Sequence, residues 1–301
     1  MDILIHLILV ILMPPLLFGV INRTKALFAG RTGAPLLQPY FDIYRLLRKG
    51  MVFSHVSTWI FRAGPIITLA AIFTAALLLP LGNHAPPLSF SGDMILFAYL
   101  LALGRFCTTL AALDTGSSFE GMGASREVTY SCLAEPVVFI VLLTLSRLSG
   151  SLTLSGILTH SSATLWMTSG AALLLLVAGL FMVLLVENSR IPFDDPNTHL
   201  ELTMIHEVMV LDHSGPAFGM IVYTSALKLF ILGAFFLHLA LPLRAADSRL
   251  EWLVFIVFML LLSITIGVVE SVMARFRLNR VPQMLLIASV VSVFAMILVL
   301  R

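Results

Sequence analysis

Long apolar stretches separated by short polar connections run along the whole chain. A hydrocarbon core about 30 Å thick requires about 20 residues of α-helix, and eight stretches reach that length. They cover residues 3–21, 60–81, 94–113, 130–149, 165–186, 217–241, 252–273 and 282–300. The strands of a membrane β-barrel alternate apolar and polar residues, whereas these stretches are continuously apolar. The pattern predicts an all-α polytopic membrane protein, with residues 1–301 forming a single membrane domain.

Composition supports this class. Hydrophobic residues make up 59% of the chain and charged residues 11%, and the mean hydropathy is +1.03, outside the range of soluble globular domains. The net charge of +2 gives no reason to expect nucleic acid as a partner. Only Asp2 precedes the first span, which has no basic leader and no small-residue cleavage site, so we expect it to remain as a helix.

Lysine and arginine are distributed unevenly between the connections. Those at 22–58, 114–129, 187–216 and 274–281 carry most of them, while the other connections offer mainly Arg244 and Arg249. By the positive-inside rule the four basic connections face the cytoplasm and both chain ends lie on the opposite side.

The first connection contains an amphipathic segment. Six apolar residues recur at helical spacing against four polar ones; they are Leu36, Leu37, Tyr40, Ile43, Tyr44 and Leu47, against Gln38, Asp42, Arg45 and Arg48. This predicts a helix along the membrane surface after the first span. It could serve as a lipid anchor, or as the floor of a cavity or a docking face for a soluble partner.

Carboxylates at costly positions point to function. Glu135 precedes Pro136 inside the fourth span, and an isolated carboxylate at that depth costs several kcal/mol unless it is paired, protonated or hydrated. The glycine-rich connection before it, residues 114–127, allows close approach of the backbone to another group. We therefore expect a functional role for Glu135.

The connection between the fifth and sixth spans is the most polar part of the chain. Residues 187–213 hold six of the sixteen acidic residues and three of the eight histidines. Pro192 and Pro196 prevent one uninterrupted helix, which predicts a broken acidic segment. Neighbouring carboxylates can exchange protons near neutral pH, so this segment has the chemistry of a proton relay. Lys228, inside the sixth span, either pairs with a carboxylate or passes protons itself.

No metal or catalytic site is predicted. His199, His206 and His213 are spaced two helical turns apart, about 10.5 Å, too far to share one ion without a bend in the chain. Cys107 and Cys132 lack the spacing of a zinc or iron–sulfur site, and no nucleotide-binding or hydrolase motif is present. Redox cofactors, if they take part, are expected in partner subunits.

Three segments carry a resemblance to a known family, and a weaker match is Ala274-Arg275-Phe276-Arg277. They are Arg31-Thr32-Gly33 followed by Leu37-Gln38-Pro39-Tyr40-Phe41-Asp42; Gly123-Ala124-Ser125-Arg126 followed by Glu135; and Glu187-Asn188-Ser189-Arg190-Ile191-Pro192-Phe193-Asp194 followed by Glu201. The chain resembles membrane subunit 1 of respiratory complex I and its counterpart in membrane-bound nickel-iron hydrogenases, of the formate hydrogenlyase subunit 4 and hydrogenase-4 component C type.

That resemblance implies a subunit of the prokaryotic inner membrane on which a soluble redox arm docks, with an acidic path leading towards antiporter-like subunits. The expected proton path comprises Glu135, Glu187, Asp194, Glu201, Glu207, Asp212 and Lys228. The expected cavity or docking face comprises Arg31, Gln38, Asp42, Asp114, Arg126, Glu127, Arg190 and Arg275.

Departures from the complex I pattern favour the hydrogenase branch. The segments Leu113-Asp114-Thr115-Gly116-Ser117 and Gly123–Glu127 look like that branch, whereas Asn22, Ala34, Asn197 and His199 differ from complex I. The resemblance thus implies a non-catalytic subunit that couples electron transfer to proton or sodium movement, with iron–sulfur clusters and a nickel-iron centre in its partners. The alternative is the quinone-cavity subunit of an NADH:quinone oxidoreductase, with flavin in its partners. A stand-alone transporter and a purely structural anchor are further readings.

Overall fold

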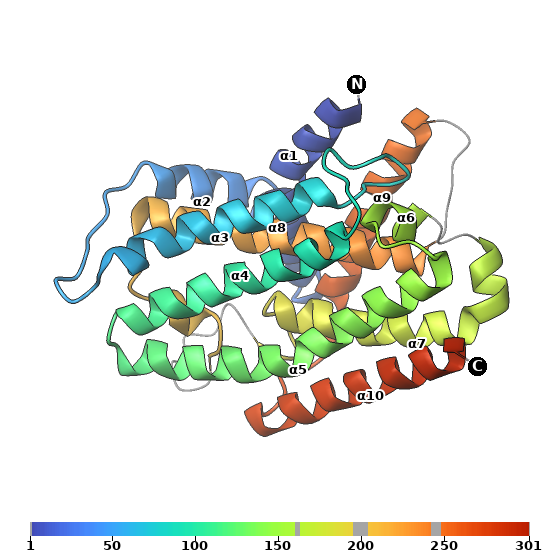
Figure 1. Ribbon diagram of the computed structural model, residues 1–301. Coiled ribbons are helices and arrows are strands. Elements are labelled where there is room, and N and C mark those ends of the chain that lie inside the picture. The colour runs from blue at the N-terminus through green and yellow to red at the C-terminus, as the bar shows by residue number, and fades with distance from the viewer. Residues whose placement is uncertain (1, 160–162, 195–203, 242–247, 301) are drawn as a thin grey trace.

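The computed structural model describes residues 2–159, 163–194, 204–241 and 248–300. In these ranges the chain forms helices and no strand. The α-helices are α1 (Asp2–Phe28), α2 (Gln38–Leu47), α3 (Trp59–Leu78), α4 (Asp93–Asp114), α5 (Ser118–Ser149), α6 (Leu154–Thr159), α7 (Ala163–Glu187), α8 (Gly215–Ala240), α9 (Ser248–Val272) and α10 (Val281–Leu300). Two 3₁₀ turns, η1 (Glu207–Val210) and η2 (Leu278–Arg280), complete the set (Figure 1).

Eight of these helices are long and apolar enough to cross a membrane: α1, α3, α4, α5, α7, α8, α9 and α10. This confirms the all-α class and the eight predicted spans. The first span extends further than predicted, over residues 2–28 rather than 3–21. Helix α3 packs along α4, α10 packs against α5 and α7, and α1 packs against α9 (Figure 1).

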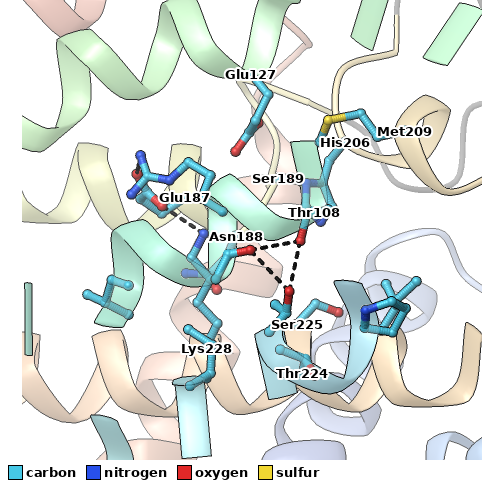
Figure 2. A pocket seen from close by; sticks show the side chains of 17 residues that line it. Thr108, Glu127, Glu187, Asn188, Ser189, His206, Met209, Thr224, Ser225 and Lys228 are labelled. Carbon is cyan, nitrogen blue, oxygen red and sulfur yellow. Dashed lines mark hydrogen bonds and ion pairs between the residues drawn. The ribbon is translucent and has the colours of Figure 1, made fainter. Parts of the chain in front are cut away.

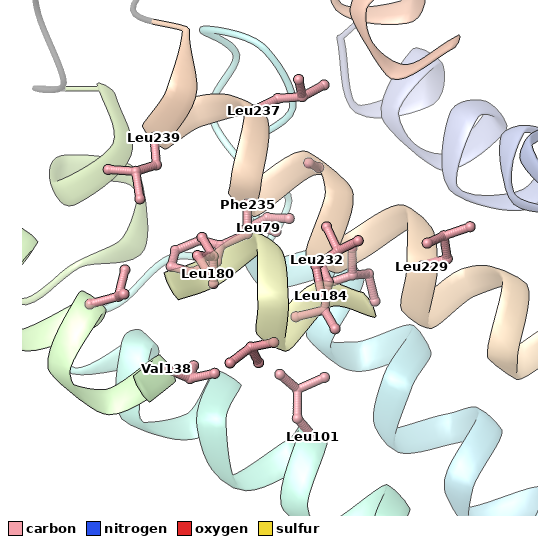
Figure 3. Close-up of a cluster of buried hydrophobic side chains, with 14 of the residues drawn as sticks. Leu79, Leu101, Val138, Leu180, Leu184, Leu229, Leu232, Phe235, Leu237 and Leu239 are labelled. Atoms are coloured by element: carbon pink, nitrogen blue, oxygen red, sulfur yellow. The ribbon is translucent and has the colours of Figure 1, made fainter. Parts of the chain in front are cut away.

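Helix α8 has the most buried face of the eight spans and contributes much of the core. Its Leu232 and Phe235 pack with Leu184 of α7, Val138 of α5 and Leu101 of α4 (Figure 3). Since lipid is as apolar as leucine, the packing between such helices depends on close fit more than on exclusion of water. At Gly267 of α9, for example, an added Cβ would lie only 2.8 Å from Thr24 Cβ of α1.

The glycine-rich connection 114–129 is not the loop that the sequence suggested. Helix α5 begins at Ser118, so most of this signature forms its first turns, and its 32 residues extend about 48 Å, well beyond a membrane core. At Gly123 another segment packs closely on the helix: a Cβ there would lie 2.3 Å from Val208 Cγ1 and 3.0 Å from Ile205 O. The expected close approach of backbone is therefore present, although within a helix.

The amphipathic helix after the first span is confirmed as α2. It packs against the beginning of α8, where a Cβ at Gly219 would lie 3.2 Å from Leu46 Cβ, and it also contacts α1. The hydroxyl of Tyr40 donates a hydrogen bond to the carbonyl of Leu12. No residue of α2 is buried, and Phe41 and Tyr44 are more than half exposed. Helix α2 thus covers the middle of α1 and the beginning of α8 and leaves an apolar face uncovered within the described chain.

The break between the fifth and sixth spans is also confirmed. Helix α7 ends at Glu187, a turn follows through Asp194, and α8 begins only at Gly215. Arg190 N donates to Leu185 O and Asp194 N to Arg190 O, so the turn folds back on the end of α7. Glu201, together with Asp195, Asn197 and His199, lies outside the described residues.

Candidate functional site

Glu187 is the centre of a buried group of charges. Its side chain is 7% exposed, and its two oxygens face different cations. Oε2 lies 2.7 Å from Lys228 Nζ of α8 (Figure 2), and Oε1 lies 3.1 Å from Arg105 Nη1 of α4. Burial removes the hydration shell of this carboxylate, and the two cations at ion-pair distance take its place. The free-energy cost of burying each charge is therefore largely offset by the others.

A second carboxylate extends this group. Glu135 Oε1, on α5, lies 3.3 Å from the same Arg105 Nη1. Four ionised side chains from four helices thus form a chain in the order Lys228, Glu187, Arg105, Glu135. Glu135 differs from Glu187 in being 40% exposed, beside the exposed Tyr99 and Phe139 on the lateral surface of the bundle.

Three cavities meet at Glu187. The first, of about 50 Å³, lies among α3, α4 and α8 and includes Thr68, Thr108, Ser225 and Lys228 in its wall (Figure 2). The second, of about 260 Å³, extends from Glu187 to Glu135 between α4 and α5. The third, of about 10 Å³, reaches from Glu187 to Asp194. A water molecule occupies about 30 Å³ in the liquid, so the second cavity has room for several.

Glu127 belongs to this site, although the sequence placed it with the docking face. It lines the first and third cavities together with Glu187. His206 lines the first cavity as well. The polar wall is completed by Asn188, whose Oδ1 is buried and has no hydrogen-bond partner among the described residues.

Asp194 holds the segment that follows the break. Its Oδ2 accepts hydrogen bonds from the backbone N–H groups of Ile205 and His206, each 3.2 Å long. Its Oδ1 lies 2.9 Å from Arg275 Nη2. Asp194 therefore ties the turn after α7 to the segment before η1 and to the end of α9, and it also lines the third cavity.

A second buried carboxylate with two cations lies nearby. Glu270 of α9 has a fully buried side chain; its Oε1 lies 3.3 Å from Arg190 Nη1 and its Oε2 lies 2.8 Å from Lys25 Nζ of α1. The guanidinium of Arg190 also stacks 4.4 Å from the centre of the Phe18 ring. This arrangement connects α1, α9 and the turn after α7.

Glu207 and Asp212 do not join the Glu187 group. Both lie in the segment around η1 and neither lines one of the three cavities. The backbone N–H of Asp212 donates to Glu120 Oε1 over 3.0 Å, so it is Glu120, buried in the first turn of α5, that fixes this segment. His213 stacks on Phe61 with ring centres 4.0 Å apart, and burial lowers its pKa to about 4, which keeps it neutral near pH 7.

The expected docking residues fall into two groups. Asp114 caps the start of α3 by accepting hydrogen bonds from Thr58 N at 2.7 Å and Phe61 N at 3.2 Å. Arg126 donates to Met204 O over 2.9 Å. These residues, like Arg190 and Arg275, hold connections together. Arg31 is exposed, and Gln38 and Asp42 are half-buried; Gln38 Nε2 donates to Asp42 Oδ1 over 2.9 Å on the surface of α2.

Sequence reasoning missed Arg105, Glu120 and the partners of Glu270. Arg105 carried a usable signal, because a single arginine in the middle of an apolar span is as costly as the carboxylate at Glu135. Glu120 gave no such signal, since it stands in what read as a solvated loop. Among the described residues no three His, Cys, Asp or Glu side chains gather as metal ligands.

This geometry defines the class of the protein. It is an eight-span membrane protein with buried ion pairs that border cavities large enough for water. A family model described as NADH dehydrogenase matches residues 1–300, and the chain belongs to that family. This confirms the resemblance seen in the sequence motifs.

Curated relatives cover nearly the whole chain. Formate hydrogenlyase subunit 4 of Escherichia coli K12 is 30% identical over 287 residues, which is 93% of this chain and 92% of that protein. Hydrogenase-4 component C of the same strain is 31% identical, over 90% of this chain and 86% of that protein. An NADH-quinone oxidoreductase subunit of Anaplasma phagocytophilum is 28% identical, over 81% of this chain and 77% of that protein.

The fold is also found in a solved structure. A chain of the membrane-bound sulfane sulfur reductase, an archaeal respiratory membrane complex, superposes with a TM-score of 0.85 at 20% identity. The match covers 99% of this chain and 100% of that chain. The likeness shows a shared fold.

Proposed function

We propose that this chain is the membrane-anchoring and ion-coupling subunit of a hydrogenase-type respiratory complex in the prokaryotic inner membrane. Similarity to formate hydrogenlyase subunit 4 and hydrogenase-4 component C over nine tenths of the chain supports this branch. In this proposal soluble partners carry the iron–sulfur clusters and the nickel-iron centre, antiporter-like membrane subunits adjoin the bundle, lipid covers the rest, and both chain ends lie on the outer side.

The observation that carries the coupling role is that Glu187 lines all three cavities while pairing with cations from two other helices. Lysine and glutamate side chains both exchange protons, and water bridges the gaps between them. A proton leaving the Lys228 ammonium reaches Glu187 directly over 2.7 Å, and then Glu135 through the waters of the 260 Å³ cavity. From Glu135, which opens on the lateral surface, the proton passes to a neighbouring membrane subunit.

The proposal also includes a docking face for the soluble arm. The cytoplasmic connections carry the docking face for the soluble arm, built on the uncovered apolar face of α2 with Arg31, Gln38 and Asp42 beside it. A rearrangement there would reach Lys228, the partner of Glu187, through α8, on which α2 packs.

A quinone is the cofactor implied by the complex I branch, and the cavities at Glu187 do not fit it. Small-molecule sites usually enclose about 300–1,000 Å³, whereas the three cavities hold about 50, 10 and 260 Å³ and have ionised side chains in their walls. Such spaces suit water and protons. We therefore route no step through a quinone.

Subunit and metal composition tests the proposed assignment. The chain is tagged in its own host and extracted in mild detergent, and co-purifying subunits are identified together with nickel, iron and flavin. We expect nickel and iron without flavin. Flavin and iron without nickel would move the chain to an NADH:quinone oxidoreductase, and purification without partners would contradict a role in any complex.

A further inference from the structure

Arg105 is the least expected charge in the molecule. It stands near the middle of α4, a helix that crosses the membrane, and its side chain is only 10% exposed. A guanidinium stays protonated under all physiological conditions, so it can neither give nor accept the transferred proton. Its presence between two carboxylates of the proposed path therefore needs another explanation.

The N–H donors of Arg105 are poorly satisfied by hydrogen bonds in the observed position. Nε and Nη1 are buried and make no hydrogen bond within the described part of the chain. Nη1 lies within ion-pair distance of both carboxylates, 3.1 Å from Glu187 Oε1 and 3.3 Å from Glu135 Oε1. Arginine usually binds a carboxylate with two parallel N–H donors, and neither glutamate receives that arrangement here. The guanidinium is held between two partners and fully engaged by neither.

Space for movement is present on the side where it would be needed. Arg105 lines the wall between the cavity that contains Lys228 and the larger cavity that contains Glu135. A shift towards Glu135 would move the guanidinium into the larger cavity of about 260 Å³. Water displaced from this cavity can leave at the lateral surface.

We propose that Arg105 is a movable positioning residue that sets the order of proton transfer between Glu187 and Glu135. This inference rests on the proton path proposed above. When Lys228 gives its proton to Glu187, Lys228 becomes a neutral amine and Glu187 a neutral carboxyl group. Glu187 then no longer attracts the guanidinium, which moves to Glu135, the one carboxylate of the two that is still charged.

The second step reverses the first. As the guanidinium returns towards Glu187, it lowers the proton affinity of Glu187 and leaves Glu135 able to accept a proton. The proton then moves through cavity water from Glu187 to Glu135, Glu187 regains its charge, and neutral Glu135 is free to pass the proton on. Lys228 is reprotonated from the first cavity. Each step transfers one proton, and the guanidinium keeps all of its own. The movement makes one transfer depend on completion of the other, which prevents a proton from running back.

The test uses inside-out membrane vesicles that contain the whole complex. Reduced methyl viologen supplies electrons, hydrogen is measured by gas chromatography, and proton uptake is followed by a pH-sensitive dye, giving protons moved per electron. We expect Arg105→Gln to lower this ratio about tenfold while hydrogen production continues. Arg105→Lys restores the charge and should recover the ratio to within about threefold of wild type. Arg147→Gln, which removes an exposed arginine at the far end of α5, should leave the ratio unchanged.

Comparing proton movement with assembly separates a moving guanidinium from a fixed anchor. A fixed anchor for Glu187 predicts that Arg105→Gln lowers the amount of assembled complex, measured by immunoblotting, at a wild-type ratio per complex; a moving guanidinium predicts a lower ratio per assembled complex. Wild-type pumping per electron in Arg105→Gln, or an unrescued Arg105→Lys, would each overturn the inference. A different result would contradict the proposed function itself, namely a wild-type number of protons moved per electron in Glu187→Gln as well.

Discussion

Glu187 and Glu270 have the same kinds of charged neighbours but differ in their access to cavities. Each stands near the end of an apolar helix, is nearly or fully buried, and lies between one lysine and one arginine. Glu187, however, lines three cavities and shares its arginine with a second carboxylate, whereas Glu270 lines none of those three cavities. In the proposed function, the same triad of charges transfers protons at Glu187 and holds helices together at Glu270, and access to water and to a second acceptor makes the difference.

The largest expected effect concerns the Glu270 group. Glu270→Gln leaves the buried Arg190 and the partly buried Lys25 without their anion, and breaking a buried pair from one side costs about 3–5 kcal/mol. We expect a marked fall in the amount of complex in the membrane, measured by quantitative immunoblotting of membrane fractions. Equal amounts in Glu270→Gln and wild type would show that this triad does not hold the helices.

The two lysines allow the comparison to be made directly. Lys228→Met should lower protons moved per electron about tenfold, because it removes the proposed proton donor to Glu187. Lys25→Met should lower the amount of complex but leave the ratio per assembled complex at the wild-type value. Similar ratios in the two variants would remove the distinction between the groups.

Substitution of a closely packed glycine beside the Glu270 group is expected to have a smaller effect on stability. Gly267→Ala forces Thr24 and α1 away from α9 beside the Lys25–Glu270 pair, and overpacking of this kind costs about 1–3 kcal/mol. Gly104→Ala, next to Arg105, meets ordinary contacts at 3.4 Å and serves as the control. Thermal unfolding in detergent should therefore show a lower Tm for Gly267→Ala alone.

The smallest expected effect is the pH dependence contributed by His213. Its pKa is near 4 in the folded protein and about 6.5 in the unfolded chain, so the unfolded state binds the extra proton between these values. This contribution is fully present above pH 6.5 and is lost as the pH falls towards 4. Tm should thus fall on going from pH 7 to pH 5, and fall less in His213→Phe. An unchanged pH dependence in that variant would show that His213 is not the source.

Most of the fold could be predicted from the sequence, because eight apolar stretches of bilayer length leave few alternatives to eight helices. Glu135 and Glu187 could be predicted as a site because ionised groups in lipid are costly. The start of α5 could not, since Gly121 and Gly123 are typical of a loop, and the segment around Val208 that packs on the helix at Gly123 lies far along the chain. The sequence also grouped Glu207 and Asp212 with Glu187, whereas neither lines one of the three cavities, because the break after Glu187 removes the periodicity that fixes which way a side chain faces.

The central claim is that Glu187, and not merely a buried charge triad, couples electron flow to proton movement. The most direct measurement is the number of protons moved per electron in vesicles containing Glu187→Gln, compared with Glu270→Gln at equal amounts of assembled complex. We expect at least a tenfold loss in Glu187→Gln and a wild-type ratio in Glu270→Gln. A wild-type ratio in Glu187→Gln, or equal losses in both, would contradict it.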